Sequence, residues 1–84
     1  MMIDREQERM DAEELQILIH SPGWKVFLKH LNGRRMMALD ALAIEESDRE
    51  IHRLQGAVQA IDQVKLLPQQ VIEDARNQNP ESAL

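Results

Sequence analysis

The side chains that could do chemistry in this sequence are three histidines, an acidic segment and two serines. His20, His30 and His52 lack the paired spacing by which two histidines on one helix face bind zinc. We interpret each as a surface or capping residue. The sequence has no cysteine, which excludes thiolate zinc sites and disulfides and suits a reducing compartment.

The acidic segment comprises Glu45, Glu46, Asp48 and Glu50. It could attract a cation, but it lacks the loop glycine and ligand order of a calcium site. Ser47 and Glu50 have the spacing of a capping box, so we interpret the segment as a solvated turn before a helix. Ser21 and Ser47 show no pattern of a nucleophile activated by a base, and no glycine-rich phosphate loop is present. The sequence predicts no enzyme activity, no cofactor and no metal.

Two apolar stripes with the same seven-residue repeat define the elements that must position these side chains. The first comprises Trp24, Leu28, Leu31, Arg35, Ala38 and Leu42, and the second comprises Ile51, Leu54, Val58 and Ile61. Such stripes are typical of helices that pack lengthwise, as in a coiled coil. The short polar break between them requires neighbouring helices to run antiparallel. We therefore expect an all-α fold with an antiparallel helical hairpin of about residues 22–45 and 48–67.

Three positions interrupt this pattern. Asn32-Gly33 often ends a helix, but the apolar register agrees on both sides, so we expect a continuous helix. Arg35 is expected to extend to solvent, to pair across the interface or to fix the register. Pro68 is expected to end or kink the second helix at Leu67.

The flanking segments complete a single domain of residues 1–84. Asp11 and Glu14 predict a capped start for a short N-terminal helix. A short helical segment is expected over residues 69–76, while residues 1–10 and 77–84 are expected to be flexible. Two helices cannot enclose a core alone, so burial must come from these segments or from a second copy, which favours a homo-oligomer.

Helix packing and self-association are assigned to a set of apolar side chains and one glycine. The set is Trp24, Phe27, Leu28, Leu31, Leu39, Leu42, Ile51, Leu54, Gly56, Val58 and Ile61. Gly56, with Ala57 and Ala60, indicates a close helix crossing, either within the hairpin or between copies. Met36 and Met37 are interpreted as core residues in preference to an adaptable contact surface.

Charge is distributed unevenly within a net charge of -5. Only residues 21–44 are positive, and their bases are Lys25, Lys29, Arg34 and Arg35. These bases spread around the helix without aromatic residues for base stacking, so nucleic-acid contact is an alternative that we do not favour. No apolar run approaches the roughly 18 residues of a membrane span, so we expect a soluble, cytoplasmic protein that does not bind membranes.

Three short motifs carry a resemblance to a known group of proteins. They are Ser21-Pro22-Gly23-Trp24-Lys25, Arg53-Leu54-Gln55-Gly56 and Leu66-Leu67-Pro68. With the acidic turn between them, they resemble small helical proteins that tailed bacteriophages encode among virion-structure and DNA-packaging genes. The resemblance covers about residues 15–70. It implies a phage protein that is located in the host cytoplasm or associated with the virion and has a phage or host protein as partner.

The leading hypothesis is a non-enzymatic helical interaction protein that self-associates and binds another protein during virion assembly or genome packaging. The first alternative is a small nucleic-acid-binding or transcription-regulating protein. The second is an acidic phage effector that inhibits a host protein, with residues 1–20 mimicking a polyanion.

Overall fold

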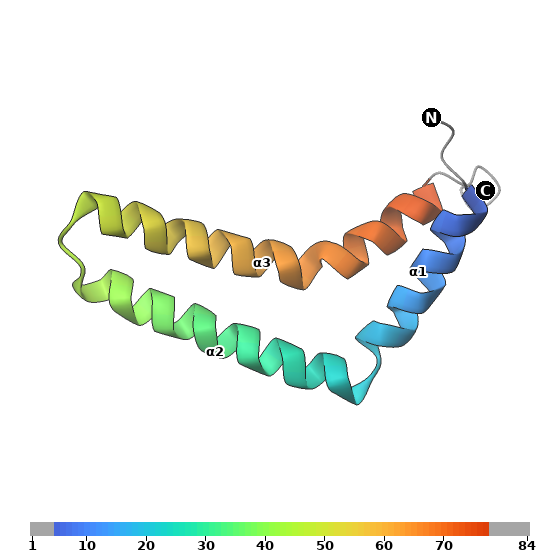
Figure 1. Ribbon diagram of the computed structural model, residues 1–84, viewed down its shortest axis with the longest axis horizontal. Helices are drawn as coiled ribbons and strands as arrows, with labels where there is room; N and C mark the ends of the chain where they lie inside the picture. Colours follow the sequence, from blue (N-terminus) through green and yellow to red (C-terminus); the bar gives the residue numbers. More distant parts are fainter. Residues whose placement is uncertain (1–4, 78–84) are drawn as a thin grey trace. The chain divides into compact units, whose positions relative to one another are not determined.

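The computed structural model describes residues 5–77, which form three helices and no strand. Helix α1 spans Arg5–Ile19, α2 spans Pro22–Ile44 and α3 spans Asp48–Asn77 (Figure 1). The predicted all-α fold is confirmed. Flexibility was predicted for residues 1–10 and 77–84, of which residues 1–4 and 78–84 lie outside the described residues. Residues 5–10 and Asn77 lie within helices α1 and α3.

The chain divides into two compact units. Unit 1 contains residues 1–25 and 66–84, of which 5–25 and 66–77 are described. Unit 2 contains residues 26–65. Each unit therefore combines parts of two long helices, and each has its own buried side chains.

Unit 2 is built from α2 and α3, which run alongside one another in opposite directions within it (Figure 1). Ala38 of α2 and Leu54 of α3 are its buried hydrophobic residues. The other members of the two apolar stripes in this unit are half-buried, and they are Leu28, Leu31, Arg35, Leu42, Ile51, Val58 and Ile61. A seven-residue repeat keeps one face of each helix toward its neighbour, so both stripes lie on the less exposed faces.

Arg35 pairs with a side chain of the opposite helix. Its Nε donates a hydrogen bond to Asp62 Oδ1 at 2.8 Å, and its Nη2 donates to Asp62 Oδ2 at 3.4 Å. This two-point contact suits the planar guanidinium and fixes the register of α2 against α3. Of the three roles expected for Arg35, the structure supports pairing across the interface.

A serine caps the N-terminus of each of the two long helices, α2 and α3. Ser21 Oγ accepts a hydrogen bond from the Trp24 backbone N–H at 3.2 Å, and Pro22 occupies the first helical position. Ser47 Oγ accepts a longer bond, 3.4 Å, from the Glu50 N–H. A capping box also needs a hydrogen bond from the Ser47 N–H to the Glu50 side chain. Here the Ser47 N–H instead donates to Glu45 Oε1 at 3.1 Å, and the Glu50 side chain binds Arg53.

Helix α2 is continuous through Asn32-Gly33, as the apolar register indicates. A glycine inside a helix costs about 1 kcal/mol relative to alanine. A Cβ built on Gly33 would meet nothing within 4 Å, so no neighbouring group of the chain requires the glycine there.

The prediction that the second helix ends before Pro68 is wrong. Helix α3 continues to Asn77 with Pro68 inside it, so there is no separate segment over 69–76. A proline at this point removes one backbone hydrogen bond, a cost of roughly 3 kcal/mol in a helix interior. Burial compensates, because Pro68 is buried and Ile72 is only 4% exposed. The seven-residue repeat of α3 runs on through Pro68, Ile72 and Ala75.

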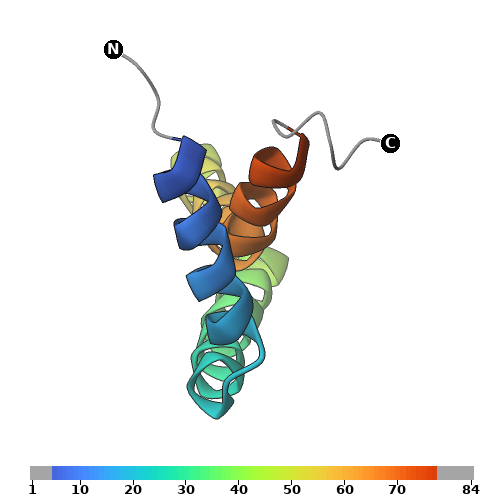
Figure 2. The same ribbon diagram turned by 90° about the vertical axis from the view of Figure 1, so that its right-hand side faces the viewer.

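Helix α1 is longer than predicted and begins at Arg5. Asp11 therefore does not cap it, and Asp11 Oδ1 instead accepts a hydrogen bond from Gln7 Nε2 at 2.9 Å. Good helix formers and two first-turn glutamates support the earlier start. Within unit 1, α1 lies beside the last part of α3 (Figure 2), and Ala12 is its buried residue.

Candidate functional site

The opposite face of α2 carries a second apolar stripe that sequence reasoning missed. This outer stripe consists of Val26, His30, Gly33, Met37, Asp40 and Ile44, separated by alternating steps of four and three residues. All six residues are exposed. The exposed fractions of the apolar side chains are 56% for Val26, 72% for Met37 and 84% for Ile44. Helix α2 thus presents three exposed apolar side chains, with His30, Gly33 and Asp40 between them, on the face opposite its α3-facing stripe.

Exposed apolar side chains outnumber buried ones over residues 5–77. The buried hydrophobic residues are Ala12, Ala38, Leu54 and Ile72. The exposed large hydrophobic residues are Met10, Ile17, Leu18, Val26, Phe27, Met36, Met37, Ile44, Val64, Leu66 and Leu67. The interpretation of Met36 and Met37 as core residues is wrong, because both project into solvent from α2. Exposed apolar side chains that gather in a contiguous patch mark an interaction site.

The predicted packing residues lie mostly on the α2 and α3 faces that point at one another. Leu54 is buried, and the half-buried members are Trp24, Leu28, Leu31, Leu39, Leu42, Ile51, Val58 and Ile61. Phe27 and Gly56 are exposed. A Cβ on Gly56 would meet nothing within 4 Å, so Gly56 makes no close helix crossing within residues 5–77. A crossing between copies at Gly56 stays a prediction.

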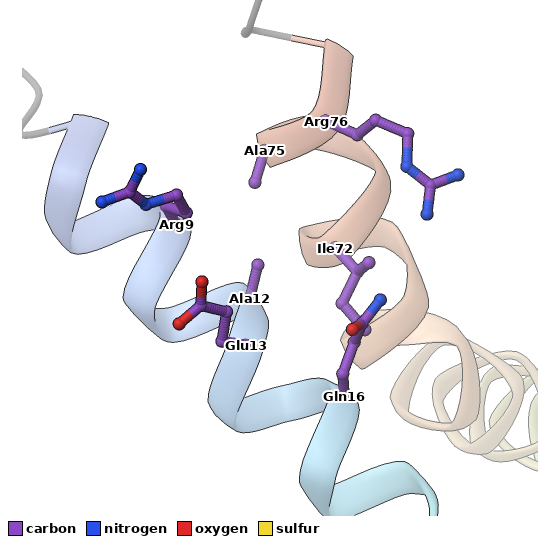
Figure 3. A pocket seen from close by; sticks show the side chains of 7 residues that line it. All are labelled: Arg9, Ala12, Glu13, Gln16, Ile72, Ala75 and Arg76. Carbon is purple, nitrogen blue, oxygen red and sulfur yellow. The ribbon is translucent and has the colours of Figure 1, made fainter. Parts of the chain in front are cut away.

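A groove lies between α1 and the last part of α3 in unit 1. Its volume is about 420 Å³, and its lining residues are Arg9, Ala12, Glu13, Gln16, Ile72, Ala75 and Arg76 (Figure 3). Ala12 and Ala75 point toward one another across it, which lets the two helices approach closely. The groove holds no nucleophile with a neighbouring base, so its geometry assigns it no reaction.

The histidines and acids are placed as surface residues. His20 Nδ1 lies 2.7 Å from the Gln16 carbonyl oxygen, where it binds a backbone acceptor near the end of α1. His30 and His52 are exposed. Over residues 5–77, no three histidine, aspartate or glutamate side chains are grouped closely enough to hold a metal ion.

The four basic residues of α2 differ in exposure and in pairing. Lys25, Lys29 and Arg34 are exposed, whereas Arg35 is half-buried and paired with Asp62. Reversal of Arg35 would therefore disturb the fold as well as any contact with nucleic acid.

Two carboxylates have shifted pKa values. The hydrogen bond from Arg35 holds the pKa of Asp62 below its ordinary value, and the positive charges of Arg35 and Lys65 act in the same direction. The hydrogen bond from Arg53 likewise lowers the pKa of Glu50. Both groups sit in ion pairs of the helical framework, so these shifts report structural pairing rather than acid–base chemistry.

No family model, curated protein or solved structure matches this chain. The geometry of its own residues therefore carries the functional argument. Across the described range, no helix is both long enough and apolar enough to cross a membrane.

Proposed function

We propose that this protein is a non-enzymatic helical interaction protein that self-associates and binds another protein. The observation that carries the proposal is the excess of exposed over buried large apolar side chains in residues 5–77. Burying one such side chain contributes roughly 1.5 to 3 kcal/mol. Association can therefore bury more large apolar side chains than the chain buries by itself.

The antiparallel hairpin of α2 and α3 is the scaffold in this proposal. The Arg35–Asp62 pair and buried Leu54 support it, because they hold the two helices in one register. A scaffold of this kind leaves the outer faces of both helices available for partners. Self-association then buries surface that the hairpin cannot cover by itself.

Helix α1 is the proposed contact for a second protein. Met10, Ile17 and Leu18 are exposed on it, and acidic residues such as Glu13 and Glu14 lie beside them. This mixture fits a partner surface that is apolar with a basic rim. An assembly role in a phage particle or in genome packaging rests on the motif resemblance and completes the proposal.

The test is the solution mass of the full chain, measured by light scattering after size exclusion over a wide concentration range. The proposal predicts a dimer or larger closed assembly whose melting temperature rises with protein concentration. A monomer with a concentration-independent melting temperature would contradict self-association. Duplex binding at low salt that disappears on reversing Lys29 and Arg34 would favour a nucleic-acid-binding protein instead.

A further inference from the structure

We propose that two copies of this chain pair through the outer stripe of α2, with their α2 helices antiparallel and a two-fold axis beside residue 35. This inference rests on the proposed function, which predicts self-association but assigns it no surface. The α3-facing stripe of α2 is already occupied within unit 2, where Ala38 is buried. The outer stripe lies on the opposite face of α2 and is exposed, as are Phe27 and Met36 to either side of it.

The spacing of the outer stripe makes it complementary to itself. Its steps of four, three, four, three and four residues read the same in both directions. A second copy turned end over end therefore places its stripe in register with the first. Val26 then faces Ile44 of the second copy, and the same contact repeats at the other end, because a two-fold interface uses each contact twice.

Polar residues favour the antiparallel orientation over the parallel one. In the antiparallel register, His30 faces Asp40 of the second copy, which pairs a donor with a carboxylate acceptor. In a parallel register, Asp40 would face Asp40 and His30 would face His30. Like charges that face one another across an interface are unfavourable, so the stripe discriminates against parallel pairing.

Gly33 and Met37 are the residues of the outer stripe nearest the proposed two-fold axis. Gly33 faces Met37 of the second copy, so the smallest residue of the stripe meets its longest apolar side chain. No atom of the chain lies within 4 Å of a Cβ built on Gly33, which leaves this space open to a partner. The flexible thioether of methionine adapts well to such irregular space.

The outer face of α3 provides the comparison within the same unit. Its exposed residues are mostly polar or small, and they are His52, Gln55, Gly56, Gln59, Ala60 and Gln63. This face lacks the large apolar residues that α2 presents at Val26, Met37 and Ile44. Apolar content therefore assigns the dimer contact to α2 in preference to this face of α3.

A matched pair of glycine variants tests the surface. Gly33→Glu places a charge in the proposed interface, and Gly56→Glu places the same charge on the outer face of α3. Both glycines lie inside helices with no atom within 4 Å of an added Cβ, so neither variant clashes within the chain. Sedimentation measurements should show that Gly33→Glu raises the dimer dissociation constant by at least about ten-fold, because it buries an unpaired charge. The α2 interface predicts that Gly56→Glu leaves that constant unchanged. An increase confined to Gly56→Glu would assign the contact between copies to the crossing predicted at Gly56 and would overturn the α2 interface.

Disulfide trapping tests the orientation, and the cysteine-free sequence makes it direct. An equal mixture of Val26→Cys and Ile44→Cys chains should give a crosslinked heterodimer under mild oxidation. Val26→Cys alone should not crosslink, because the two Val26 positions lie about 27 Å apart in the antiparallel register. Crosslinking of Val26→Cys with itself in preference to Ile44→Cys would overturn the proposed orientation.

These experiments distinguish failure of the α2 interface from failure of the proposed function. A dimer whose dissociation constant responds equally to Gly33→Glu and Gly56→Glu, or to neither, overturns the α2 interface and leaves the proposed function intact. A chain that stays monomeric at every concentration overturns both.

Discussion

Replacing Leu54 with alanine probes the packing between α2 and α3. Leu54 is 7% exposed and lies on the face of α3 toward α2, which makes it the most buried large side chain of unit 2. Leucine-to-alanine changes at buried sites cost about 2 to 5 kcal/mol. A unit of two helices can close partly around the lost volume, so we expect about 2 to 3 kcal/mol here. For a chain of this size, that corresponds to a fall in melting temperature of roughly 10 to 20 °C.

The assay is thermal and urea denaturation followed by far-ultraviolet circular dichroism at a fixed protein concentration. Val64→Ala is the matched control, because Val64 lies on the same helix but is 43% exposed. We expect the control to cost less than about 1 kcal/mol. Equal losses of stability in the two variants would refute the assignment of the faces of α3.

Three further predictions concern an ion pair, two helix caps and a glycine. The pKa of Asp62 is lowered in the folded chain, so its contribution to stability is present above the unfolded pKa, near 4, and is lost as pH falls through the folded value. Asp62→Asn should therefore lower the melting temperature at pH 7 and flatten its decline in acid; an unchanged acid profile would contradict the role of the pair with Arg35. Ser21→Ala should destabilise by about 1 kcal/mol in urea denaturation, and Ser47→Ala by less, because the cap bond of Ser47 is longer. Gly56→Ala should stabilise by about 0.5 to 1 kcal/mol in the same assay, and a loss of stability would reveal a neighbour that crowds this position.

The sequence predicted the helical class and the continuity of α2, because these follow from local periodicity. The pairing of Arg35 with Asp62 could not be predicted, because Asp62 follows Ile61 and is not itself a position of the apolar repeat. The continuation of helix α3 through Pro68 could not be predicted either. A proline usually ends a helix, and here burial of Pro68 and Ile72 outweighs that local preference.

The outer stripe of α2 was present in the sequence but could not be interpreted from it. Val26, Met37 and Ile44 follow the same repeat as the facing stripe, and apolar residues on two sides of a helix suit a buried helix equally well. From the sequence, Met37 is interpreted as a core residue in preference to an adaptable contact surface. Which side is covered depends on the packing of α3, and periodicity within α2 holds no information about that packing.

Self-association through α2 is tested most directly by sedimentation equilibrium of the wild-type chain and of Met37→Glu. Met37 is 72% exposed, so its replacement leaves the packing between α2 and α3 intact. We predict that the wild type sediments at twice the chain mass while Met37→Glu sediments as a folded monomer at the same concentration. A wild-type monomer, or a Met37→Glu dimer of undiminished strength, would contradict the account.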